Sequence, residues 1–84
     1  SNPDAAVWLL AQWQRDHGKH EGVVRALLEL GRRTQHETVR AAMRTMAAVL
    51  GGKLKSQLYL ALLSMHDAAA LAQMSFMAGR ETTS

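Results

Sequence analysis

The strongest constraint on the fold of this chain lies in residues 58–78, which read LYLALLSMHDAAALAQMSFMA and contain no Gly, no Pro and one formal charge, at Asp67. Good helix formers dominate this stretch, so we expect it to be α-helical. Side chains three and four residues apart share one face of a helix, and here apolar residues follow most of the circumference. A helix of this kind is buried on several sides.

Three rows of side chains run along the predicted helix. One row is wholly apolar: Leu58, Leu62, Met65, Ala69, Ala72 and Phe76. The next row includes His66, and the third is more polar: Leu60, Ser64, Asp67, Leu71 and Met74. We expect His66 to be buried against a backbone group or a partner. A charged Asp in mid-span costs about 2.5–3.5 kcal/mol on insertion scales, so we predict no membrane-spanning segment.

Caps and glycines divide the remaining chain into helices and short loops. The signals are, in chain order, Asn2, Pro3 and Asp4 at a helix start, Gly18 at its end, a capping box from Thr34 to Glu37, and Gly51 with Gly52 at the next end. They predict one all-α domain over residues 1–84, a four-helix bundle-like fold with helices at about 3–17, 22–33, 35–50 and 53–79. Gly31 either ends the second helix or permits close packing. Trp8 and Trp13 are predicted core anchors, with an exposed, partner-binding Trp8 as the alternative.

The length of the last helix suggests an oligomer. A helix over residues 53–78 is about 39 Å long, whereas a domain of this size has a radius of gyration near 12 Å. An apolar helix that extends beyond its own domain would expose apolar side chains unless a second copy packs against them. We therefore predict a homodimer or higher oligomer that forms through this helix. The predicted interface is the wholly apolar row: Leu58, Leu62, Met65, Ala69, Ala72 and Phe76. A kink near His66 that folds the helix back on itself is the competing picture.

The sequence offers little for catalysis. It has no Cys, and its Ser residues lack the glycine-rich turn of a nucleophile elbow. His17 and His20 stand among carboxylates, but Gly18 separates them, so we predict a solvated loop and no metal site there. We therefore predict no enzyme activity, no catalytic residue and no cofactor.

The net charge of +3 allows a nucleic-acid partner without demanding one. Residues 27–43 hold a helix, a short turn and a capped helix that contains Thr38, Val39 and Arg40, and this stretch resembles a helix-turn-helix in outline. It departs from that pattern at the turn, which is a residue or two too long after the glycine. The resemblance implies contact with a duplex through Arg32, Arg33, Arg40 and Arg44.

Together these features favour a small, non-enzymatic interaction or assembly module, such as an adaptor, co-chaperone or regulatory subunit, that homo-oligomerises and binds a protein partner. The alternative is a dimeric DNA-binding transcriptional regulator of helix-turn-helix type. We expect a cytoplasmic location, because the chain lacks Cys and shows no basic segment ahead of an apolar run at its start.

Overall fold

The computed structural model of the chain describes residues 2–16 and 21–82, with side chains over 4–16 and 21–75. Within these residues it contains α-helices and no strand, which confirms the predicted all-α class. The helices are α1 (Asn2–Arg15), α2 (Glu21–Arg33), α3 (Glu37–Val49), α4 (Gly52–Ser64) and α5 (Ala68–Thr82). The Cα radius of gyration of 12.5 Å is that expected for one domain of this length.

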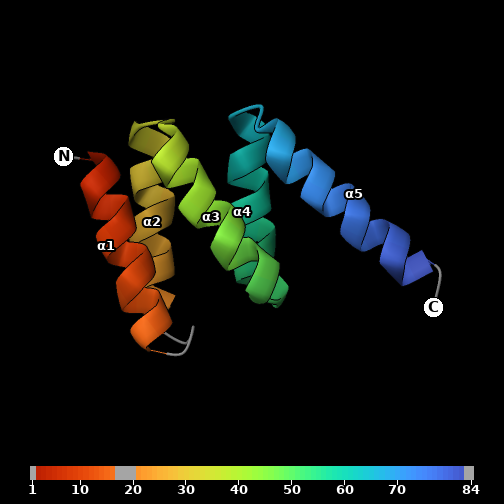
Figure 1. Cartoon of the computed structure of the whole chain (residues 1–84), viewed down its shortest axis with the longest axis horizontal. Coiled ribbons are helices and arrows are strands. Elements are labelled where there is room, and N and C mark those ends of the chain that lie inside the picture. Colours follow the sequence, from red (N-terminus) through yellow and green to blue (C-terminus); the bar gives the residue numbers. More distant parts are fainter. Residues whose placement is uncertain (1, 17–20, 83–84) are drawn as a thin grey trace.

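Helix α3 is the central element of the fold. In Figure 1, α1 and α2 lie side by side, and α3 (green) crosses from them toward α4 (teal). It packs against all three, most extensively against α4. Its buried row is Val39, Ala42, Met43, Met46 and Ala47. The other core residues are Ala6, Trp13, Val23, Val24, Leu27, Leu28, Leu58, Tyr59, Leu62, Met65 and Ala70. Of the two tryptophans, Trp13 is therefore in the core, whereas Trp8 is 60% exposed.

Gly31 brings α2 close to the centre of the core. The helix continues through it to Arg33, so close packing is the role that the structure supports. A Cβ atom added at Gly31 would lie 2.9 Å from Sδ of Met43 and 3.1 Å from Cε of Met65. These two methionines occupy the space that a larger residue at position 31 would need.

The start of α3 differs from the prediction. The prediction of a capping box at Thr34 and Glu37 is wrong, because the N-cap of α3 is His36. The Nδ1 atom of His36 accepts a hydrogen bond from the Thr38 N–H at 3.2 Å. The Thr34 hydroxyl oxygen instead accepts a hydrogen bond from the His36 N–H at 3.4 Å. Glu37 thus stands in the first helical turn, with its carboxylate turned toward arginines further along α3.

The continuous helix predicted over residues 53–79 is wrong, because the chain bends at Met65, His66 and Asp67. We call these three residues the α4–α5 corner. Helix α4 ends before it, and α5 begins after it. Figure 1 shows α5 (blue) starting beside the end of α4 and diverging from it toward the C terminus. The competing picture of a kink near His66 is the one that the structure supports.

Backbone hydrogen bonds define the corner as a helix C-terminal motif. The N–H of His66 donates to the carbonyl of Leu63 at 3.0 Å, and the N–H of Asp67 donates to the carbonyl of Leu62 at 3.1 Å. These two bonds form a Schellman motif, in which the residue after the cap is left-handed and usually Gly. Here that residue is His66, with φ of 56°. Its side chain is exposed, so the expectation of a buried His66 is wrong.

Candidate interaction surface

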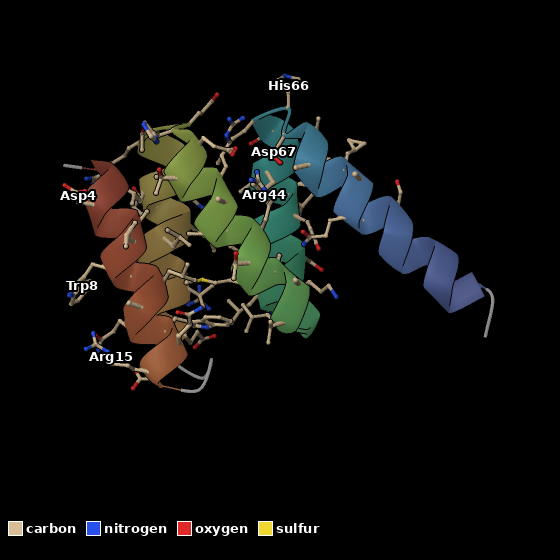
Figure 2. All side chains as sticks on the ribbon, in the orientation of Figure 1. Asp4, Trp8, Arg15, Arg44, His66 and Asp67 are labelled. Carbon is tan, nitrogen blue, oxygen red and sulfur yellow. The ribbon has the colours of Figure 1, made fainter. Side chains whose placement is uncertain are left out.

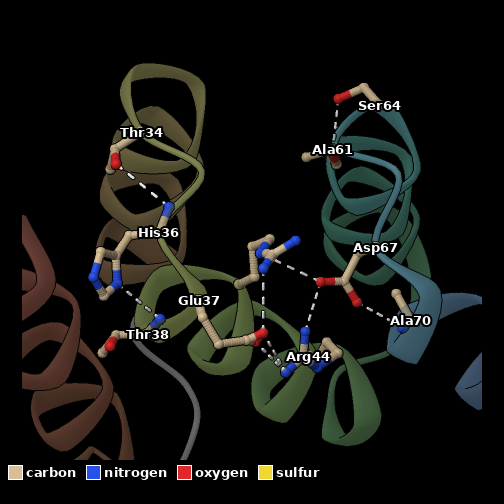
Figure 3. Close-up of polar contacts among 10 residues, drawn as sticks. Thr34, His36, Glu37, Thr38, Arg44, Ala61, Ser64, Asp67 and Ala70 are labelled. Atoms are coloured by element: carbon tan, nitrogen blue, oxygen red, sulfur yellow. Dashed lines mark hydrogen bonds and ion pairs between the residues drawn. The ribbon is translucent and has the colours of Figure 1, made fainter.

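Asp67 fastens the α4–α5 corner to α3 through a buried ion pair (Figure 3). Its side chain is 3% exposed, and Oδ2 lies 2.6 Å from Nη1 of Arg44. The other oxygen, Oδ1, accepts a hydrogen bond from the N–H of Ala70 at 2.7 Å. A carboxylate in this position caps the first turn of a helix. One side chain therefore both starts α5 and holds that start against α3.

Arg44 is shared between two carboxylates, and Arg40 reinforces the cluster. Arg44 Nη2 lies 3.0 Å from Oε2 of Glu37, and Arg40 Nε lies 3.6 Å from Oδ2 of Asp67. The hydrogen bond from Arg44 lowers the pKa of Glu37, and partial desolvation of the Glu37 carboxylate opposes that effect. The same hydrogen bond raises the pKa of Arg44. Two arginines thus balance two acids in this cluster, which we call the corner cluster: Glu37, Arg40, Arg44 and Asp67.

A second polar contact positions α5 one turn further along. The side-chain N–H groups of Gln73 donate to the Tyr59 hydroxyl oxygen at 2.6 Å and to the carbonyl of Arg44 at 3.2 Å. Ala70, on the same side of α5, is fully buried. Helix α5 therefore touches the body of the domain through its first two turns.

The outer sides of α4 and α5 carry an apolar surface. Leu60 and Leu71 are 65% and 50% exposed, respectively, and Leu63 and Met74 are partly exposed. A shallow groove of about 440 Å³ runs between the two helices, lined by Lys55, Ser56, Tyr59, Leu60, Leu63 and Met74. Leu71 precedes Met74 by three residues, so it lies on the same side of α5. We call Leu60, Leu63, Leu71 and Met74 the α4–α5 apolar face.

A second groove, of about 550 Å³, adjoins this face at Leu60 and lies between α2 and α4. Its polar rim includes Arg25 and Arg32 of α2. Each arginine already contacts a glutamate of its own helix: Arg25 lies 3.3 Å from Glu21, and Arg32 lies 3.1 Å from Glu29. This rim is therefore a solvated, internally paired helix surface beside the apolar face.

The corner divides the six residues of the predicted oligomer interface between two environments. Leu58 and Leu62 are fully buried, and Met65 is 7% exposed, so these three already pack inside the domain. Ala69 and Ala72 are exposed on α5. Phe76 belongs to α5, but its side chain lies outside the described set. In this conformation only the α5 half of the predicted row, as far as it is described, is open to a partner.

The four arginines predicted to contact nucleic acid also divide into two pairs. Arg32 and Arg33, at the end of α2, are about three-quarters exposed and lie near Glu29. Arg40 and Arg44 are 27% and 18% exposed, respectively, and belong to the corner cluster. The helix expected to read the duplex is α3, which is packed between α1, α2 and α4. The structure thus does not gather the four arginines on one open surface.

The described residues offer neither a metal site nor a membrane span. In that part of the chain, no three His, Asp or Glu side chains come together in a way that could hold a metal ion. The predicted loop with His17 and His20 lies outside the described residues. None of the described helices combines the length and apolar character needed to cross a bilayer.

The α4–α5 apolar face cannot be predicted from the apolar content of the rows alone. Leu60, Leu71 and Met74 belong to the row that contains Ser64 and Asp67, which is more polar than the wholly apolar row. One sequence feature could have indicated the face: the wholly apolar row is also the row best suited to the core of the domain itself. When that row is buried in the core, the neighbouring row with Leu60, Leu71 and Met74 remains at the surface.

Comparison with known proteins does not extend these observations. No protein-family model, curated protein or solved structure matches the chain.

Proposed function

We propose that this chain is a non-enzymatic helical assembly module that self-associates through the α4–α5 apolar face. The observation that carries the proposal is the exposure of Leu60 and Leu71 on adjoining helices, with a groove of about 440 Å³ beside Leu60. Contiguous exposed apolar surface on a small domain is typical of a protein–protein contact.

The charge distribution favours a second copy as the occupant of this face. Residues 68–79 of α5 contain no charged residue at all. When two copies meet across a two-fold axis, each surface contacts its own equivalent, so a surface with charge of one sign would repel itself. A neutral, apolar helix avoids this repulsion, and the nearest charge in the groove lining, on Lys55, comes from α4.

Small size supports the same proposal. A domain of 84 residues buries a modest share of its surface, and the chain has no Cys with which to add disulfides. Association is a common way for such a domain to gain stability. An adaptor or regulatory role toward a different protein would use the same face, whereas DNA binding would use Arg32 and Arg33 at the end of α2.

The test is the solution mass of the wild type and of matched single variants. We expect wild type to approach twice the 9.2 kDa chain mass as concentration rises, and Leu60→Asp and Leu71→Asp to stay monomeric. Val49→Asp is the control, because Val49 is 71% exposed on α3 and lines neither groove. This variant should associate like the wild type.

A wild type that stays monomeric at every concentration would refute self-association. If it instead bound random duplex DNA with an affinity that fell steeply as salt rose, DNA binding would replace the proposal. In that case Arg32→Ala with Arg33→Ala should weaken the binding, and Leu71→Asp should not.

A further inference from the structure

We infer that the α4–α5 corner is a hinge and that α5 exchanges between two copies of this chain, so that each α5 packs on the body of the other copy. This inference rests on the proposed self-association and specifies its mode: in an exchanged dimer, each α4–α5 apolar face is formed by α4 of one copy and α5 of the other. It follows from three observations: the backbone of His66, the contacts of Asp67 and the division of one apolar row by the bend.

The local sequence is compatible with both a bent and a straight chain. Residues 58–78 contain neither Gly nor Pro, so no residue in the corner prevents a continuous helix. In the bent form, His66 holds a φ of 56°, a conformation that a residue with a Cβ adopts at a cost. Its side chain points away from the body of the domain in Figure 2, so no burial compensates for that cost. Straightening the corner would relieve it.

Tertiary contacts hold the corner bent. The Asp67 carboxylate pairs with Arg44 of α3 at 2.6 Å and caps α5 at Ala70. Gln73 adds its hydrogen bonds to Tyr59 and to the Arg44 carbonyl. The contacts with Arg44 and Tyr59 come from α3 and α4, so the bend depends on the body of the domain as well as on the corner itself.

A second copy is the occupant that fits the surface uncovered when α5 swings away. That surface already matches α5 in detail, because it receives Ala70 in the core and the Gln73 amide at Tyr59. The α5 of another copy re-forms the Ala70 and Gln73 contacts without any new complementarity. Exchange in both directions covers both bodies and closes the dimer.

The wholly apolar row supports the same mode. In a straight helix, Leu58, Leu62, Met65, Ala69 and Ala72 share one face. The bend puts the first three into the core and leaves Ala69 and Ala72 exposed. An exchanged dimer brings the two halves of the row onto one continuous helix face, which crosses from one body to the other.

The test compares His66→Ala with His66→Gly. Both substitutions remove the same exposed imidazole, but Ala favours the straight helix and Gly favours the left-handed bend. The chain has no Cys, so spin labels can be placed at Gln57→Cys and Ser75→Cys, both exposed positions. A straight helix separates these positions by about 27 Å, at ~1.5 Å per residue, and the bend brings them much closer. In an exchanged dimer, Gln57 of one copy also lies near Ser75 of the other copy, so the doubly labelled chain is diluted into an excess of unlabelled chain and only the distance within one chain is read. Label distance and solution mass are measured on the same samples, after circular dichroism has shown equal helix content.

We expect the His66→Ala variant to give the long distance in a dimer fraction several-fold larger than that of wild type. His66→Gly should give the short distance and a monomer, and the wild-type dimer fraction should give the long distance. Equal distances and masses for the two variants would overturn the hinge, as would a long distance in a monomer. A dimer with the short distance would overturn exchange while leaving self-association in place, whereas monomers throughout would overturn both.

Discussion

Replacing Asp67 with Ala should remove a large part of the stability of this domain. The substitution deletes the cap on α5, worth about 1 kcal/mol, and breaks a buried ion pair, which typically costs about 3–5 kcal/mol. Arg44 is still 18% exposed and keeps Glu37, so the lower end of that range applies. We expect a loss of about 3–4 kcal/mol, against a total of about 4–13 kcal/mol for a chain of this length.

Asp67→Asn separates the two contributions. The amide oxygen can still accept the hydrogen bond from Ala70, so the cap is retained and the charge is lost. We expect this variant to lose about 2 kcal/mol, because the amide NH2 group then faces Arg44 and cannot accept its hydrogen bond, while the buried site stays filled. The measurement is urea unfolding followed by circular dichroism, with the slope checked for two-state behaviour.

Glu21→Ala is the matched control. Glu21 also pairs with an arginine, but both side chains are about 60% exposed, so this variant should lose no more than about 0.5 kcal/mol. A loss for Asp67→Ala as small as that of the control would refute the role of Asp67 at the corner. A double-mutant cycle of Asp67→Asn with Arg44→Met should give a coupling of at least about 1 kcal/mol. Coupling near zero would show that the two residues act separately.

Three further predictions address the core and the corner cluster. Gly31→Leu should lose at least about 2 kcal/mol in urea unfolding because it overpacks against Met43, whereas Gly31→Ala should be near neutral, since better helix propensity offsets a smaller overlap. The folded-state pKa of Glu37 is lowered from 4.5, so the contribution of Glu37 to stability is present above that pH and is lost as the pH falls through the lowered value. The difference in unfolding free energy between wild type and Glu37→Gln should therefore shrink between pH 6 and pH 3. An unchanged difference would contradict this prediction. Trp13→Ala should lose about 3–5 kcal/mol of unfolding free energy, and Trp8→Ala, at a 60% exposed site, less than about 1 kcal/mol.

The helical class was predictable because local patterns determine it. Apolar spacing, the pair Gly51 and Gly52, and the absence of strand-like alternation all act over a few residues. The first three helices accordingly agree with their predicted bounds to within two positions. The capping box failed for a local reason of another kind. His36 competes with Thr34 for the cap, and its ring nitrogen reaches the Thr38 N–H.

The bend could not be predicted from residues 58–78 alone, because Arg44, which pairs with Asp67 at the bend, lies outside them. Arg44 and Asp67 are 23 positions apart, and nothing in the sequence pairs them until α3 and α4 have packed together. A straight helix over residues 53–79 would be too long for this domain. A second copy is one way to cover such a helix, but the chain instead divides it by turning at His66.

The balance at the corner also explains why the sequence is ambiguous there. A left-handed residue with a side chain costs about 1–2 kcal/mol. Opening the corner loses the charged hydrogen bond from Arg44 to Asp67, worth about 1.5–3 kcal/mol, and the two hydrogen bonds from Gln73, worth about 0.5–1.5 kcal/mol each. The bent form is therefore preferred by a few kcal/mol, with the cap on Ala70 adding about 1 more. A margin of that size is within reach of one substitution or of the apolar area that a second copy buries. The α4–α5 corner is thus compatible in sequence with both a bend and a continuous helix, and the same residues would allow the protein to adopt either conformation.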